Sequence, residues 1–515
     1  MSASWGAWSA IRTAVLPSLR SRPPFRSLSG GMSFSQELEH AMKRKNVKYF
    51  NWLIAKYAEA AAVHRCNRLL QAMAEVQVKP NEHSWGGLIN GYMRMGDVEG
   101  GLRKVREYLT GGGELNTVLG TSIIKGLVGA GRMEEATRFL EEMKAMRVPP
   151  NDRTLKTLLR GCLRWGRGGE AESIYEEMRA QGMQDQVSDA LMIRIRCQDG
   201  RLEEALSQLR GLTGPAPLSR LAVGHMLLME GRDGEALEQA ARAMEEIGGA
   251  GAAAVDEISK LKIKTDAEFI QRIVEERKQG RRDEQSLRPS MQDLFLSSSS
   301  NVDKGNLKTG LSKLLRAVGP DKPLHVELCA GSGEWVLDRA GVEDANWVAV
   351  EYRYDRAHEI LTRRSLLGLN NLVVLNLDAA LVCSDLLRPA SVRSMFLRFP
   401  EPMGAGSVFF SPSFLRAVHK NLEPNGTFNI VTDDRQGFAD MLLLLLLLLL
   451  LPSDLRDSYL KVVKSCPQLF KARSTARREG AKKGEGAVSY FDQLWRSRGF
   501  QERYFIELGK VPRNV

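Results

Sequence analysis

One short turn recurs along the first half of this chain. It pairs a Gly with an Asp or an Arg and occurs at Gly96, Gly131, Gly166, Gly200 and Gly231. The successive spacings are 35, 35, 34 and 31 residues. A period in this range is typical of a solenoid, in which a unit cannot bury its apolar face alone and stacks on its neighbours. The region from about Val47 to Glu245 is therefore predicted to be an array of repeats.

Each repeat is predicted to hold two amphipathic helices. One unit has apolar residues at helical spacing over Thr121–Val128 and Met133–Met146, and the next over Thr154–Leu163 and Glu170–Met178. Prolines close two of the units, because proline cannot continue a helix. These closing segments are Pro80-Asn81 and Pro149-Pro150-Asn151.

The repeats resemble pentatricopeptide (PPR) repeats, notably in Gly131-Arg-Met-Glu-Glu-Ala136 and Phe139-Leu-Glu-Glu-Met143. The resemblance implies an α-solenoid that binds single-stranded RNA, one base per unit. The family's base-recognition position falls here on Gly86, Thr121, Lys156 and Ala190. Only Thr121, paired with Asn151 at the end of its unit, matches a base-discriminating pair. A tetratricopeptide-like solenoid that binds protein is the alternative, since both families are helix pairs of similar period.

Because only one position matches, shape or backbone recognition of RNA is expected rather than a long sequence code. Candidate phosphate contacts are Lys125, Lys156, Arg160 and Arg194. Each of these side chains also fits a solvated charge on a helix face.

A second signal stands at Leu324–Trp335. An apolar run meets a small-residue turn at Cys329–Gly333, and a helical pattern follows from Glu334. This order predicts strand, tight loop and helix, the junction at which an α/β sheet holds a cofactor. Glycine there lets the main chain approach a ligand, and the first N–H groups of a helix favour an anionic group. An ordinary β-to-α turn would also account for this segment alone.

Acidic residues follow the next predicted strands. Glu351 follows Trp347–Val350, in the position of an acid that binds a ribose diol, and Asp378 follows Leu372–Leu377. A fourth strand, Ser394–Phe399, leads into Pro400-Glu401-Pro402. There is no G-x-G-x-x-G motif, so the order suits S-adenosylmethionine better than NAD.

Seven motifs in order resemble bacterial-type tRNA (guanine-N7) methyltransferases. They are Glu327–Gly333, Glu351-Tyr352-Arg353, Asn371-Leu372 leading to Asp378-Ala379, Phe399–Pro402, Leu422–Gly426, Thr432-Asp433 and Ser489–Asp492. The resemblance covers roughly Leu324–Gly509. It implies a Rossmann-like class I methyltransferase that transfers the methyl group of S-adenosylmethionine to guanine N7 in tRNA.

The resemblance also implies roles for individual residues. The cofactor-binding set is Glu327, Ala330, Gly331, Gly333, Glu351, Tyr352, Asp378 and Ala379. Asp433 and Glu401 would hold the guanine as catalytic residues. Substrate binding is assigned to Ser489, Phe491 and Asp492, and in the repeats to Thr121 and Asn151. The charge of the basic segment Lys471–Lys483 makes Arg477 and Arg478 candidate phosphate contacts in place of the family's basic loop, and a solvated loop is the alternative.

The chain departs from the family pattern in several places. Cys329 replaces a Gly, Glu401 replaces an Asp, Ser489 and Asp492 are conservative replacements of Thr and Glu, and the uncharged Met403–Ser407 stands where the family has a basic loop. The lost basic loop and Glu401 support an alternative, an RNA-binding PPR protein whose methyltransferase domain is catalytically inactive.

Composition adds expectations about partners and location. The net charge of +11 suits a polyanionic partner, and six widely spaced cysteines without a C-x-x-C pair indicate a reducing compartment and no zinc site. The histidines form no ligand cluster, so no metal is predicted. A basic, Ser-containing start without an acid before Glu37 fits a transit peptide for mitochondrion or plastid. A basic N-terminus without a targeting role is the alternative.

The predicted organisation is a transit peptide over 1–36, PPR-like repeats over 37–247, a charged linker over 248–303 and a methyltransferase domain over 304–515. The linker is expected to be helical over Val255–Arg282 and flexible over Ser297–Ser300. The leucine run Leu442–Leu451 is too short to cross a membrane. No membrane partner is expected, and no oligomeric state is predicted.

Overall fold

The structure is a computed structural model, and it describes residues 33–60, 62–248, 256–280, 295–297, 304–319, 321–398, 409, 412–432 and 504–509. The chain divides into two compact units, Met1–Glu114 and Leu115–Val515.

The first unit is helical. Its helices are α2 (Phe34–Arg44), α3 (Val47–Glu59), α4 (Val63–Glu75), α5 (Glu82–Met95) and α6 (Val98–Thr110). Phe50, Leu53 and Leu69 are fully buried in its core. Helix α2 begins inside the predicted transit segment, and Ser33 and Gln36 form a capping box at its start.

The second unit continues the repeats with eight helices, which confirm the four helices predicted for the central repeats. They are α7 (Thr117–Gly129), α8 (Met133–Ala145), α9 (Asp152–Trp165), α10 (Gly168–Ala180), α11 (Gln186–Gln198), α12 (Leu202–Arg210), α13 (Pro217–Met229) and α14 (Asp233–Gly248). The turn residues Gly131, Gly166, Gly200 and Gly231 all have positive φ, which explains the recurring glycine.

The first helices of five repeats, α3, α5, α7, α9 and α11, are capped in the same way, whereas α13 begins at Pro217 without a side-chain cap. An Asn or Asp side chain accepts a hydrogen bond from the backbone N–H two or three residues later, at Asn46, Asn81, Asn116, Asn151 and Asp185. Such caps satisfy N–H groups that lack a partner within the helix. Their spacings of 35, 35, 35 and 34 residues are more regular than those of the glycine turns.

Helix α15 (Glu257–Lys278) confirms the helix predicted in the linker, but it does more than connect two domains. Its buried residues Ile263, Ile270 and Ile273 share a core with helices α11 to α14. This helix therefore extends the helical array.

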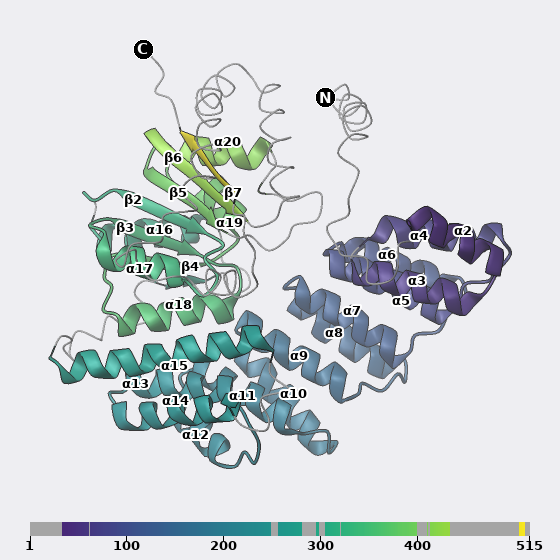
Figure 1. Ribbon diagram of the computed structural model, residues 1–515, viewed down its shortest axis with the longest axis horizontal. Helices are drawn as coiled ribbons and strands as arrows, with labels where there is room; N and C mark the ends of the chain where they lie inside the picture. Colours follow the sequence, from purple (N-terminus) through teal and green to yellow (C-terminus); the bar gives the residue numbers. More distant parts are fainter. Residues whose placement is uncertain are drawn as a thin grey trace. The chain divides into compact units, whose positions relative to one another are not determined.

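The C-terminal part contains a seven-stranded sheet in the order β1-β4-β3-β2-β5-β6-β7 (Figure 1). The strands are β1 (Phe295–Ser297), β2 (Leu324–Leu328), β3 (Asn346–Val350), β4 (Leu372–Asn376), β5 (Val392–Arg398), β6 (Leu422–Thr432) and β7 (Tyr504–Gly509). Only the β6–β7 pair is antiparallel. The predicted multidomain organisation, a helical solenoid followed by a Rossmann-like α/β domain, is confirmed. The sheet starts before residue 304, however, because β1 lies within the predicted linker.

Helices cover both faces of this sheet. On one face, α16 (Lys304–Ala317), the π-helical turn Val382–Leu386 and α20 (Pro412–Asn421) pack on apolar strand residues. On the other, α17 (Glu334–Val342) and α18 (Tyr354–Leu366) do the same. Within the described ranges, none of the helices combines the length and hydropathy needed to span a bilayer.

Candidate cofactor site

The candidate site lies where the strand order reverses. From β2 the chain proceeds to β3 and β4 on one side and to β5 and β6 on the other. In open α/β sheets a ligand binds beyond the carboxyl ends of the strands at such a switch point. The loop that leaves β2, Cys329–Gly333, opens at this position.

This loop has three residues in the left-handed region. Cys329 has a φ of 57°, Gly331 of 62° and Gly333 of 76°. A Cβ on Gly333 would lie 2.6 Å from Ile360 of α18, whereas a Cβ on Gly331 would meet nothing within 4 Å. Gly333 is thus needed for packing, and Gly331 leaves open space. Cys329 adopts a conformation that glycine accommodates without strain, which gives a physical reason for the Gly that the resembling family has there.

Glu351 joins the ends of β2 and β3. Its Oε2 accepts a hydrogen bond from the Gly331 N–H at 2.8 Å, and its Oε1 accepts one from the Arg353 N–H at 2.9 Å. Burial raises the pKa of this carboxyl, while the two backbone donors and Arg356 oppose the shift. Each carboxylate oxygen can still accept a further hydrogen bond, so Glu351 can hold the glycine loop and a hydroxyl group together.

Glu327 lies within β2 and is 3% exposed. Its Oε1 is 3.9 Å from the Arg398 guanidinium of β5, and its buried Oε2 has no hydrogen-bond partner among the described residues. Burial raises the pKa of Glu327 to about 8, although Arg398 favours the charged form. An unsatisfied buried carboxylate oxygen is costly, and a cationic or N–H group bound at this point would satisfy it.

The other predicted cofactor residues border the same loops. Ala330 donates its backbone N–H to Val350 O, and the exposed Asp378 carboxylate accepts from Leu381 N, which caps the short helix α19 (Ala379–Leu381). Tyr352 is about half exposed.

Asn376 was not identified from the sequence. Its side-chain amide donates to the carbonyls of Glu351 and Tyr352 at 3.1 and 2.9 Å, so it fixes the loop that carries Glu351. The sequence did contain a signal for this role, because Asn376 is a polar residue at the end of a buried strand and stands two positions before Asp378.

The residues Glu327, Gly331 and Glu351 fit S-adenosylmethionine. They bring to one end of the sheet an unsatisfied buried carboxylate oxygen, open space above a glycine, and a carboxylate at the end of β3. This donor set suits a ligand with an ammonium group and a ribose diol, and among the described residues no cluster of His, Cys, Asp or Glu that would suit a metal ion is found.

In the repeats, the proposed base-recognition pair is engaged within the helical array. Thr121 is buried, and its hydroxyl donates to Thr117 O and also lies 2.7 Å from the Thr154 hydroxyl. Asn151 is exposed, but its Oδ1 caps α9 through Thr154 N. The Thr121 hydroxyl therefore has two partners inside the array, and a base would have to compete with them.

A second pair at equivalent positions was missed from the sequence. The Asn51 amide donates to Asn81 Oδ1 at 3.0 Å. Asn51 precedes Gly86 by the 35-residue repeat, and this spacing could have identified it.

Two of the four expected phosphate contacts are engaged elsewhere. Lys156 pairs with Asp152 and Asp185. Burial lowers the pKa of the Arg194 guanidinium, although Asp355 and Glu359 of the α/β domain favour its charged form. Lys125 and Arg160 are exposed, as phosphate contacts require.

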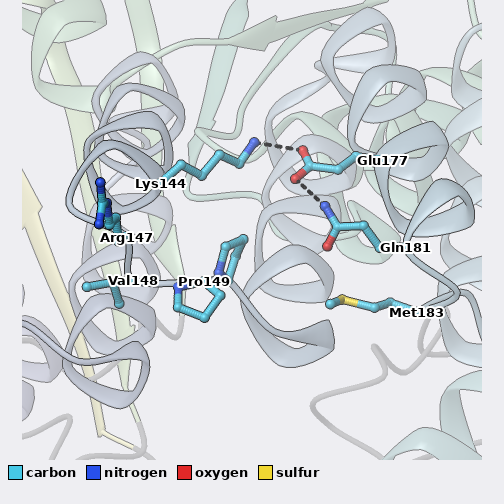
Figure 2. Close-up of a pocket in the computed structure, with 8 residues that line it drawn as sticks. Lys144, Arg147, Val148, Pro149, Glu177, Gln181 and Met183 are labelled. Carbon is cyan, nitrogen blue, oxygen red and sulfur yellow. Dashed lines mark hydrogen bonds and ion pairs between the residues drawn. The ribbon is translucent and has the colours of Figure 1, made fainter.

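A pocket of about 480 Å³ opens between two repeats. Figure 2 shows that Lys144, Glu177 and Gln181 line one side, while Arg147 and Pro149 line another. Lys144 is paired with Glu177 at 2.9 Å, so the lysine and the glutamate neutralise each other.

Several predicted site residues lie outside the described residues. They are Glu401, Asp433, Arg477, Arg478, Ser489, Phe491 and Asp492, and the leucine run Leu442–Leu451 lies outside them too.

Comparison with known families assigns both parts of the chain. A family described as "Putative methyltransferase" matches residues 321–462. The PPR repeat family matches residues 115–164, and the PPR repeat matches residues 83–107 and 153–183.

Relatives of the α/β domain carry a specific name. A tRNA (guanine-N(7)-)-methyltransferase from Chlamydia felis is 27% identical over 197 residues, which is 37% of this chain and 78% of the relative. One from Rubrobacter xylanophilus is 30% identical over 136 residues, 24% of this chain and 57% of the relative. Among solved structures, the pentatricopeptide repeat protein PPR10 from maize matches with 17% identity and a TM-score of 0.35, covering 56% of this chain and 45% of that one. The chain thus combines PPR repeats with a methyltransferase domain that has tRNA (guanine-N7)-methyltransferase homologues.

Proposed function

We propose that this protein transfers a methyl group from S-adenosylmethionine to N7 of guanine in tRNA, and that its PPR repeats bind the RNA. The observation that carries the proposal is the position of Glu351. Its carboxylate stands at the carboxyl end of β3, holds the Gly331 N–H and keeps acceptor capacity for a ribose hydroxyl. The names of the relatives support guanine N7 in tRNA as the target.

The described residues divide the work of binding the cofactor. Glu351 would accept the ribose hydroxyls, Glu327 would face the ammonium group, and the open space at Gly331 would admit the cofactor close to the main chain. When bound, the cofactor supplies an electrophilic methyl group on a sulfonium.

The reaction needs positioning rather than a strong base. Guanine N7 carries an in-plane lone pair and no proton at neutral pH, so it can attack the methyl carbon directly as the bond from that carbon to sulfur breaks. Asp433 and Glu401 are proposed to accept hydrogen bonds from guanine N1–H and its amino group, which would orient N7. Ser489, Phe491, Asp492, Arg477 and Arg478 are proposed to bind the substrate beside them.

A specific observation favours the inactive alternative as second candidate. Cys329 has a positive φ, which glycine would tolerate better, and Glu401 stands where the resembling family has a shorter Asp. An RNA-binding protein with an inactive methyltransferase domain would tolerate both departures.

We also propose import into a mitochondrion or plastid, which a fluorescent fusion of residues 1–36 would test.

The experiment measures methyl transfer from radiolabelled S-adenosylmethionine to total tRNA by the full chain, with analysis for 7-methylguanosine. Glu351→Gln and Asp433→Ala are expected to reduce transfer by roughly 100-fold or more, because misplaced groups lose orientation. Asp344→Asn is the matched control, since Asp344 is 88% exposed and pairs only with Lys322 among the described residues. If the wild-type chain binds tRNA and S-adenosylhomocysteine but labels no guanine, the inactive alternative replaces the enzyme.

A further inference from the structure

An aromatic contact links a repeat to the candidate cofactor loop. Tyr352 directly follows Glu351, and its ring packs edge-on against Trp165 at the end of α9, with ring centroids 4.9 Å apart. The indole is fixed in turn, because Trp165 Nε1 donates to Val128 O at 2.7 Å. The contact therefore joins the loop that carries Glu351 to α7 and α9, the first helices of two successive repeats.

The repeat turns leave room for this contact. A Cβ on Gly131 would lie 3.1 Å from the Tyr352 hydroxyl, and one on Gly166 would lie 2.7 Å from the Tyr354 ring. These two turns therefore fit closely against the segment between β3 and α18. A substitution in either turn would push on that segment.

Helices α15 and α18 also share a cluster of four charges, Lys262, Asp266, Glu359 and Arg363, of which Asp266 and Arg363 are buried and the other two are partly buried. Arg363 of α18 is ion-paired with Asp266 of α15 and lies 3.0 Å from Glu359, which is also 2.9 Å from Lys262. Leu366 of α18 is fully buried in the core that helices α11 to α15 form. Buried charges must remain paired, so the cluster favours one arrangement of α18 against the array.

These contacts converge on one short segment. Helix α18 begins at Tyr354, only three residues after Glu351, and Asn376 holds the carbonyls of Glu351 and Tyr352 from β4. The segment is thus held by the sheet on one side and by the repeats on the other.

We propose that Trp165 is a positioning residue for the cofactor site: through Tyr352 it sets the conformation of the Glu351 loop, so the repeats govern cofactor affinity as well as RNA binding. This inference rests on the proposed function. It predicts that a change in a repeat weakens cofactor binding in the absence of RNA.

The test is calorimetric binding of S-adenosylhomocysteine to full-length variants. Trp165→Ala is expected to weaken binding by about tenfold, the usual scale for coupling through intervening contacts. Trp165→Phe keeps an aromatic ring and should restore affinity to within about twofold of the wild type. Trp85→Ala, which removes an indole from a repeat of the first unit, is the matched control and should bind as the wild type does.

A double variant separates positioning from general damage. If Trp165 acts through Tyr352, Trp165→Ala with Tyr352→Ala binds no more weakly than Tyr352→Ala alone. Additive losses, or wild-type affinity in Trp165→Ala, would overturn the inference and leave the proposed function intact. No binding by the wild-type chain would remove the proposed function and the inference with it.

Discussion

Helix α18 has two differently built contact surfaces. Ala357, Ile360 and Leu361 join the apolar core beneath the sheet, whereas Glu359 and Arg363 meet charged residues of α15. Apolar burial stabilises without much directional preference, while a paired buried charge is stable only with its partner in place. The comparison teaches that the sheet side supplies stability and the solenoid side supplies orientation.

The largest effect is expected from breaking the charged surface. Arg363→Leu would leave the buried Asp266 carboxylate without its ion-pair partner and would take from Glu359 one of its two cations, so it is expected to lower the free energy of unfolding by about 3–5 kcal/mol. Chemical denaturation would measure the change. Lys264→Leu is the control on α15, because Lys264 is 59% exposed and should change stability by less than about 0.5 kcal/mol. Equal stability of Arg363→Leu and the wild type would mean that the cluster does not orient α18.

A pair of glycine substitutions tests the apolar surface. Gly331→Ala and Gly333→Ala both place a side chain at positive φ, which costs about 1–2 kcal/mol each. Gly333→Ala should cost more, because only its Cβ would collide with Ile360. Gly331→Ala should instead reduce S-adenosylhomocysteine affinity more than it reduces stability. Thermal unfolding and calorimetry on the two variants would compare these effects, and a larger loss of stability in Gly331→Ala would contradict the packing argument.

Two glutamates with shifted pKa values, the buried Glu327 and the partly buried Glu359, extend the comparison to pH. Burial raises the pKa of Glu327 to about 8. Burial also opposes ionisation of Glu359, but Lys262 and Arg363 outweigh it and lower its pKa to about 2. Glu327 therefore binds its proton more tightly in the folded state, and its contribution to stability falls as pH rises from about 4.5 to about 8, by at most about 1.4 kcal/mol per pH unit. The contribution of Glu359 is present above about pH 4.5 and is lost as pH falls toward about 2.

The measurement is the free energy of unfolding between pH 5 and 9. Glu327→Gln removes the titrating group and should flatten the profile. The free energy of unfolding of the variant, relative to that of the wild type, should therefore increase as pH rises. Glu359→Gln should be less stable than the wild type throughout this range. The opposite result would be a free energy of unfolding that rises from pH 5 to 8 in the wild type and follows the same profile in Glu327→Gln. That result would show that Glu327 is ionised in the folded protein.

Periodicity and strand-end chemistry were enough to predict most of the architecture. The four predicted repeat helices, the strands beginning near Leu324, Trp347 and Leu372 and the glycine loop are all present. The edge strand β1 could not be predicted, because three residues carry no measurable pattern and gain their structure from pairing with β4. The Gly331 N–H donates to Glu351, and Glu327 lies in β2 just before the glycine loop, while the roles of these residues in cofactor binding stay predictions.

What the sequence did not reveal are contacts between residues far apart in the chain. Arg194 was expected to meet phosphate, but burial lowers its pKa, and Asp355 and Glu359 of the α/β domain favour its charged form, because that domain packs on the repeats. Trp165 belongs to no motif of the sequence, and its contact partner Tyr352 lies 187 positions later. Local patterns define elements, whereas such pairings depend on how the elements pack.

The smallest effect is expected at the opposite end of α9 from Trp165. Asn151 caps this helix through Thr154 N at 2.9 Å, so Asn151→Ala should lower the free energy of unfolding by about 0.5–2 kcal/mol. Asn151→Asp keeps the accepting oxygen and should retain most of that stability. Because Trp165 still contacts Tyr352, S-adenosylhomocysteine affinity should remain within about twofold of the wild type in both variants. Asn151→Ala could instead weaken cofactor binding as much as Trp165→Ala does. In that case any destabilisation of α9 would lower cofactor affinity. The contrast between a stabilising and an orienting surface of α18 would then no longer explain cofactor affinity.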